Sequence, residues 1–133
     1  MGKNMKIYYA HAMPIYGTKT EMREKEHIMR NLPEIEIVDP GSFQDNLEKQ
    51  KEGMEYCFKL IEKCQGVIFT KFFNYITAGV GKEINYALSK SIPVHELERG
   101  KLYKITKPVK YLNRLDTIIL YRKIRMVRKI LKE

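Results

Sequence analysis

The chain has 133 residues, 44% of them hydrophobic, which suits one compact domain over residues 1–133. No apolar run approaches the roughly 18 residues of a membrane-spanning helix, and no apolar N-terminal stretch precedes a cleavage site, so we expect a cytoplasmic protein with no membrane partner. The net charge is +9, but residues 1–100 hold 14 basic and 14 acidic residues, whereas residues 101–133 hold 11 and 2. The excess positive charge therefore belongs to the C-terminal segment.

Strand-like and helix-like hydrophobic periods alternate along the first hundred residues. In chain order the predicted elements are a strand at 6–12, a helix at 18–31, a strand at 34–40, a helix through 54–64, a strand at 66–70, a helix beginning within 77–90 and a strand at 91–97. Such alternation is typical of an α/β domain with helices on both faces of a parallel sheet. We therefore predict a single-domain, flavodoxin-like sheet of four or five parallel strands in the order 2-1-3-4-5.

Local signals support the helix starts. Thr18 and Glu21 have the spacing of a capping box, and Asp45 and Glu48 repeat it. A fifth strand is expected within 101–112, and a basic amphipathic helix is expected from Asp116 to the end of the chain.

The two cysteines, Cys57 and Cys64, lie seven residues apart in one helical pattern. They therefore share a face two turns from each other, too far apart to be bridged within that helix. We expect two reduced, buried thiols, which fits a reducing compartment.

The stretch TAGVGKEINYALSK (77–90) places Gly79, Gly81 and Glu83 at the start of a predicted helix. In a parallel sheet this start lies beyond the carboxyl ends of the strands, where ligands bind. Glycines let the backbone approach a ligand closely, and the N–H groups that begin a helix favour an anion such as phosphate. The spacing matches neither a dinucleotide fingerprint nor a P-loop, so no cofactor is expected. The alternative is that Glu83 only stabilises the first turn of the helix, by about 0.3 to 1 kcal/mol.

The run GVGKEINYALSKSIPV (79–94) resembles the G-x-G-x-E-[LI]-G-x-A-x-x-x-x-K-x-[VI] segment of the nucleoside 2-deoxyribosyltransferase family. That family includes a branch that hydrolyses deoxynucleoside 5'-monophosphates. The start, KIYYAHAMPIYG (6–17), is similar to the family's first strand and substrate-holding turn, so the resemblance covers roughly residues 5–97. The remaining residues, 98–133, add a basic strand and helix.

The resemblance implies that Glu83 is the nucleophile and that Tyr8 orients it. Thr77 falls where the hydrolase branch has a small hydroxyl residue near the phosphate, beside Gly79 and Gly81. A carboxylate of this kind attacks the anomeric carbon, displaces the base and forms a glycosyl ester. The helix N-terminus is expected to keep the carboxylate ionised. A homodimer is implied as well, because family members complete each site from a neighbouring subunit.

Three departures of the chain from the family bear on the implied chemistry. The family's acidic residue on the helix before the third strand falls on Cys57, which the apolar stripe of that helix places toward the core. The strand-entry residue is Gln65, and the glycine two residues after the glutamate is Asn85. An enzyme that cleaves or transfers at an N-glycosidic bond is the leading hypothesis. A non-catalytic nucleotide-binding module, whose basic C-terminal helix engages nucleic acid, is the alternative.

Two further residues are candidates for substrate binding, His11 on the loop after the first strand and Asp39 on the loop after the second. A lone histidine at a strand end is, however, more often a hydrogen-bonded structural residue than a ligand. Neither His27 nor His95 has a partner at metal-ligand spacing, so no metal site is expected. Six aromatic residues gather by sequence at the same sheet edge, and half of them should be core residues because alternation sends neighbours to opposite faces. They are Tyr8, Tyr9, Tyr16, Phe72, Phe73 and Tyr75.

The C-terminal helix carries Leu120, Ile124, Val127 and Leu131 on one stripe. Six cations lie largely away from that stripe: Arg122, Lys123, Arg125, Arg128, Lys129 and Lys132. They form either a solvated face or a surface for nucleic acid or another acidic partner.

Overall fold

The computed structural model describes residues 5–43 and 53–130. Its five strands form one sheet in the order β2-β1-β3-β4-β5, as predicted. The strands are β1 (Met5–Ala10), β2 (Ile35–Val38), β3 (Gly66–Phe69), β4 (Val94–Glu98) and β5 (Lys101–Ile105). The helices are α1 (Lys19–Asn31), α3 (Met54–Glu62), α4 (Ala78–Ser89) and α5 (Arg114–Ile130), with short 3-10 turns η2 (Met13–Ile15) and η3 (Pro40–Phe43) after β1 and β2. The predicted capping pair Asp45 and Glu48 lies outside the described residues.

The fifth strand differs from the prediction of a wholly parallel sheet. The pairings among β2, β1, β3 and β4 are parallel, but β4 pairs with β5 antiparallel. Glu98 pairs with Lys101, so only Arg99 and Gly100 form the loop, and both have positive φ (51° and 78°). A two-residue loop of this kind closes a hairpin, whereas a parallel neighbour would need a crossover of about a dozen residues.

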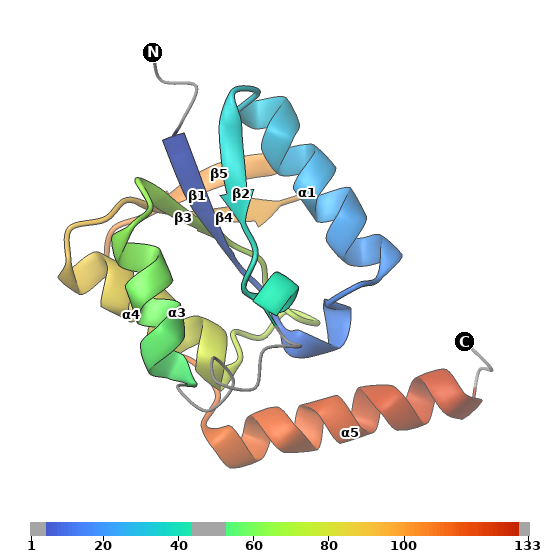
Figure 1. The fold of residues 1–133 in the computed structure, drawn as a ribbon. Helices are drawn as coiled ribbons and strands as arrows, with labels where there is room; N and C mark the ends of the chain where they lie inside the picture. Colours follow the sequence, from blue (N-terminus) through green and yellow to red (C-terminus); the bar gives the residue numbers. More distant parts are fainter. Residues whose placement is uncertain (1–4, 44–52, 131–133) are drawn as a thin grey trace.

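Helices cover both faces of the sheet, with α3 and α4 on one side and α1 on the other (Figure 1). Neighbouring residues of β1 feed the two cores, because Tyr8 belongs to the cluster under α3 and α4 while Tyr9 belongs to the cluster with Ile28 of α1. This is the alternation predicted for the pair. Each side chain of β1 therefore contacts residues on one face of the sheet, either the face with α3 and α4 or the face with α1.

Helix α1 begins where its capping signal predicts. Thr18 is the N-cap residue, and its hydroxyl accepts a hydrogen bond from the Glu21 backbone N–H at 3.3 Å. The Glu21 carboxylate reaches back to accept from the Gly17 N–H at 3.1 Å. The reciprocal bonds hold the loop after β1 against the first turn of α1.

Helix α5 lies across the end of the sheet where the parallel strands finish, below the other helices in Figure 1. It packs through Leu120, Tyr121 and Ile124 on a small cluster formed by Ala12, Ile15 and Phe72. Over the described parts of the chain, no helix combines the length and the hydrophobicity needed to span a bilayer.

Candidate functional site

A cavity of about 600 Å³ opens at the carboxyl edge of the sheet. Its walls come from the loop after β1, from η3, from α3 and its N-cap, from the first turns of α4 and from α5. The lining residues are His11, Ala12, Met13, Tyr16, Pro40, Gly53, Met54, Tyr56, Cys57, Thr77, Ala78, Gly79, Val80, Lys82, Glu83, Arg114, Thr117, Ile118 and Tyr121. The cavity is thus built by five segments of the chain, and most of its surface is apolar.

Glu83 is the acidic residue of this wall, and it is only 5% exposed. The Tyr8 hydroxyl donates a hydrogen bond to its Oε2, which joins the two residues that the resemblance pairs as nucleophile and orienting partner. Tyr8 is fully buried, and burial followed by the nearby Glu83 charge raises its pKa well above the usual value. The phenol therefore stays protonated and keeps donating.

Glu83 does not lie in the first turn of its helix. Helix α4 begins at Ala78, with Thr77 as N-cap, so Glu83 is in the second turn and is no helix-start stabiliser. Burial raises its pKa to about 7, although hydrogen bonds from Tyr8 and Cys57 act in the opposite direction. The expectation that the helix N-terminus keeps this carboxylate ionised is therefore wrong near neutral pH, because desolvation outweighs the helix field once the group leaves the first turn.

Cys57 lies at the cavity rather than only in the core. It packs against the cluster under α3 and α4, but it also lines the cavity and hydrogen-bonds to Glu83. Burial and the Glu83 charge raise the pKa of its thiol to about 12, so it remains an S–H donor. Cys57, at the position where the family pattern has an acidic residue, thus contacts the Glu83 carboxylate, but its thiol is a very weak acid. Cys57 and Cys64 are both unbridged.

The N-terminus of α4 is organised by residues of α5. The Thr117 hydroxyl accepts a hydrogen bond from the Ala78 N–H at 2.9 Å. The Tyr121 hydroxyl is hydrogen-bonded to the Thr77 side chain and accepts from the backbone N–H of Met13. Gly79 follows in the first turn and lines the cavity, so its position at the open edge of the helix suits an anion.

The two glycines before Glu83 do different work. A Cβ added at Gly81 would overlap the ring and Cβ of Tyr111, so this glycine admits the chain segment that leads into α5. Gly81 is buried and does not line the cavity. A Cβ added at Gly79 would meet only Met54 Sδ, at 4.0 Å, so packing does not require a glycine there. Of the pair, Gly79 is the residue placed to contact a ligand.

His11 and Asp39 belong to a buried ion-pair cluster beside the cavity. His11 lines the cavity, but its Nε2 lies 2.7 Å from Glu21 and its Nδ1 lies 3.0 Å from the Tyr9 carbonyl. Lys25 Nζ is 2.6 Å from Asp39, whose pKa is pushed up by burial and, more strongly, down by Lys25 and His11. Asp39 does not line the cavity. Both predicted substrate-binding residues therefore have structural partners here.

Three residues of this cluster have side-chain atoms close enough together to hold a metal ion. Nitrogen or oxygen atoms of His11, Glu21 and Asp39 lie within 4.8 Å of one another. The ammonium of Lys25 already supplies a positive charge between the two carboxylates, at 3.7 Å and 2.6 Å. The trio is therefore explained by ion pairing without a metal.

The aromatic residues predicted at this edge lie in different surroundings, and one wall of the cavity was not predicted. Among the predicted aromatic residues, Tyr16 lines the cavity, Tyr8, Tyr9 and Phe72 are buried, and Phe73 and Tyr75 are exposed. The wall from α5 was not predicted, because its helical pattern gives no sign of which partner it packs on. Its members are Arg114, Thr117, Ile118 and Tyr121.

No protein-family model, curated protein or solved structure matched this chain. The case for a function therefore rests on the residues of the cavity.

Proposed function

We propose that the protein cleaves, or transfers across, the N-glycosidic bond of a nucleoside 5'-monophosphate or nucleoside, with Glu83 as nucleophile. One observation supports this above all: a carboxylate that is 5% exposed lies in the wall of a cavity large enough for a nucleotide, held by Tyr8 and Cys57. No Lys or Arg of the described residues pairs with it. A buried carboxylate without a cation costs stability, so its place in a cavity favours a chemical role.

The proposed chemistry has two balanced steps. In the first, a Glu83 oxygen forms a bond to the anomeric carbon while the bond from that carbon to the base nitrogen breaks, and the base leaves with the electron pair. In the second, water attacks the anomeric carbon, the ester bond to Glu83 breaks, and the carboxylate is restored with release of a proton. A second base in place of water would give transfer instead of hydrolysis.

The role of Tyr8 is to hold the carboxylate. Its O–H fixes the Oε2 oxygen of Glu83, and the carboxylate that it holds is part of the cavity wall. The Cys57 thiol, with its pKa of about 12, is too weak an acid to protonate the departing base efficiently. We infer that solvent supplies that proton, and that bases able to leave without prior protonation react fastest.

The substrate's phosphate is proposed to bind at the start of α4. Gly79 and Thr77 lie there, and Lys82 and Arg114 add two cations to the cavity lining. Helix N-termini bind anions through their backbone N–H groups and the helix dipole. This arrangement favours monophosphates over free nucleosides.

A panel of nucleosides and their 5'-monophosphates tests the proposal, with released base measured by chromatography. We expect release from at least one monophosphate, with kcat/KM about tenfold or more above that of the matching nucleoside, since a charge-assisted contact contributes about 1.5 to 3 kcal/mol. Equal values for the two would refute the phosphate site. No release from any member, together with tight binding of nucleotides, would favour the alternative of a binding module.

The pH dependence of the reaction gives an independent check. The nucleophile must be ionised, and the pKa of Glu83 is raised by burial to about 7. We therefore expect kcat/KM to rise with pH, to reach a plateau above about pH 8, and to lie about a hundredfold below the plateau at pH 5. Initial rates at subsaturating substrate from pH 5 to 9 measure the profile. A flat profile would mean that no group titrating near 7 has to lose a proton.

A further inference from the structure

A second cavity, of about 700 Å³, adjoins the one that contains Glu83. The two cavities share Met13 and Tyr121, so they are neighbouring parts of one concave surface. The second is formed between the loop after β1 and the C-terminal half of α5. Its lining residues are Met13, Pro14, Tyr121, Ile124, Arg125, Arg128 and Lys129.

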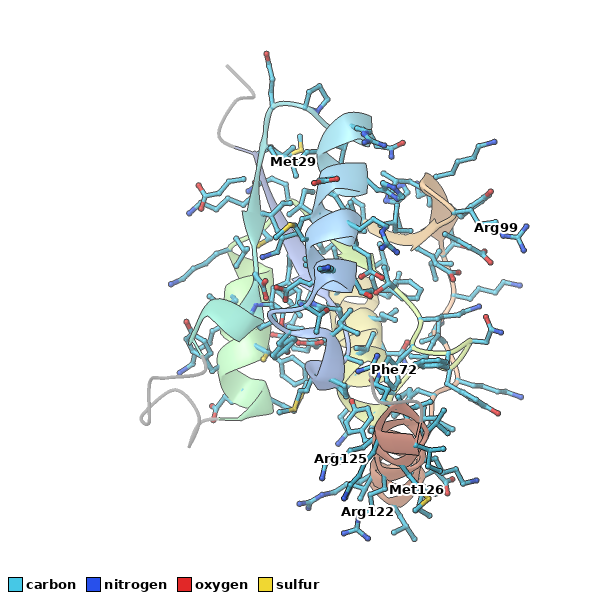
Figure 2. All side chains as sticks on the ribbon, turned by 90° about the vertical axis from the view of Figure 1, so that its right-hand side faces the viewer. Met29, Phe72, Arg99, Arg122, Arg125 and Met126 are labelled. Carbon is cyan, nitrogen blue, oxygen red and sulfur yellow. The ribbon has the colours of Figure 1, made fainter. Side chains whose placement is uncertain are left out.

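One stripe of α5 lines both cavities. Its members are spaced by four, three, four and three residues, the repeat that keeps side chains on a single face of a helix. They are Arg114, Ile118, Tyr121, Arg125 and Arg128. Figure 2, which looks nearly along α5, shows Phe72 between this helix and the sheet, and Arg125 projecting to one side. The stripe therefore leads from the Glu83 cavity outward along the helix.

The outer part of the stripe is strongly cationic. Arg125, Arg128 and Lys129 line the second cavity, and none of the described residues that line it is acidic. Between 114 and 130 the single acidic residue of α5 is Asp116, in the first turn at the opposite end. From Tyr121 to Lys129 the helix rises by about 12 Å, which is longer than one phosphate group. The charge and the length fit a ligand with several phosphates in a row.

We propose that this groove binds the phosphodiester backbone of a single-stranded nucleic acid whose terminal nucleotide enters the Glu83 cavity. The inference rests on the proposed function and names its substrate class. Because Glu83 is almost fully buried, a base can reach it only when it is out of a duplex stack, which favours a single strand. Cations along a groove neutralise successive phosphates of such a strand.

The opposite side of α5 carries exposed apolar residues and marks the competing occupant. Leu115, Ile119, Met126 and Ile130 recur at helical spacing there, and each is at least 40% exposed. A basic helix with such a stripe is the pattern of a membrane-surface helix. A membrane-surface helix needs its cations only beside the apolar stripe. Here Arg125, Arg128 and Lys129 line the groove next to the Glu83 cavity, and this favours a nucleic acid over a membrane as the occupant.

The test compares two double variants with the parent protein. The groove variant is Arg125→Gln with Arg128→Gln, and the control is Lys63→Gln with Lys104→Gln, which removes the same charge from exposed positions that line neither cavity and lie outside α5. Binding is measured by anisotropy with a short fluorescent single strand across a salt series. Base release is measured for that strand and for the matching mononucleotide, and the ratio of the two kcat/KM values is compared between variants.

We expect the groove variant to bind the strand about tenfold more weakly at low salt and to lower the slope of log K against log salt by about 1.4, since each single-strand phosphate contact contributes about 0.7. The preference for strand over mononucleotide should fall by a similar factor, and the control should match the parent. Equal losses in both variants would overturn the inference. So would Arg-dependent binding to vesicles of anionic lipid without binding of the strand.

The two proposals can fail separately. Base release from mononucleotides without groove-dependent binding of the strand would refute the groove and leave the glycosidase. Groove-dependent binding without base release from any substrate would refute the glycosidase and, with it, the entry of a terminal nucleotide for cleavage.

Discussion

Replacing Glu83 with glutamine is expected to remove base release almost completely while leaving the fold intact. An amide cannot form the glycosyl ester, so we expect kcat/KM to fall by about a thousandfold or more. Glutamine keeps the shape of the side chain, and its carbonyl oxygen can still accept the hydrogen bond that Tyr8 donates. Chromatography of released base, together with circular dichroism, measures both parts of the prediction.

The same substitution should also change stability, in a direction set by pH. Burial raises the pKa of Glu83 from 4.5 to about 7, so the unfolded chain binds fewer protons than the folded one between these values. The contribution of Glu83 to stability is therefore fully present below about pH 4.5 and is lost as pH rises through about 7, a loss of about 3 kcal/mol. Glu83→Gln removes this loss. Its Tm should exceed that of the parent at pH 8 and approach it at pH 4.

Tyr8→Phe serves as the matched control, because it keeps the ring and removes only the orienting hydroxyl. We expect it to slow base release without abolishing it.

A substrate with fluorine at the 2' position slows both steps and should trap an adduct on the peptide that contains Glu83, visible by mass spectrometry. Full activity of Glu83→Gln would refute the nucleophile. A Tm of that variant well below the parent at pH 8 would refute the assignment of a raised pKa.

Alanine substitutions at the two glycines of α4 should give opposite results. At Gly81 the new Cβ overlaps Tyr111, so the segment before α5 must shift, and we expect a loss of about 2 kcal/mol in the free energy of unfolding. At Gly79 the nearest atom is 4.0 Å away, so alanine should be neutral or stabilising by up to about 1 kcal/mol. Thermal or denaturant unfolding of both variants makes the comparison.

Gly79→Ala, the variant expected to keep its stability, should instead lose affinity for the ligand. The Gly79→Ala methyl enters the cavity at the proposed phosphate position, so we expect monophosphates to bind about tenfold more weakly, at full stability. Two equally stable variants would contradict the packing of Gly81 on Tyr111. Unchanged binding to Gly79→Ala would remove that residue from the proposed site.

Much of the fold follows from local patterns in the sequence. The alternating hydrophobic periods predicted the sheet order, and the signal at Thr18 predicted the start of α1. The fifth strand was predicted, but its antiparallel direction was missed, although the short Arg99–Gly100 connection between two β-prone runs is a hairpin signal. A family pattern that ends near residue 97 gave no information about this part of the chain.

The site was less predictable because it depends on contacts across the sequence. The motif located Glu83, and the resemblance named Tyr8 as its partner, but neither fixed the start of α4 at Ala78. That start decides that Glu83 lies in the second turn, where burial and not the helix dipole sets its pKa. The α5 wall depends on how an amphipathic helix docks, and periodicity alone gives no docking partner.

The hydrogen bond from the Ala78 N–H to Thr117 joins residues 39 positions apart and ties the start of α4 to the last helix. Tyr121 adds hydrogen bonds to Thr77 and Met13, and the apolar contacts of α5 are with a small cluster around Ile15 and Phe72, separate from the two larger cores. Such an element can detach in a local opening that costs far less than global unfolding. Each detachment would remove one wall of the Glu83 cavity while the sheet stays folded. A ligand that fills the cavity binds only when α5 is attached, so it also stabilises the attached position of that helix.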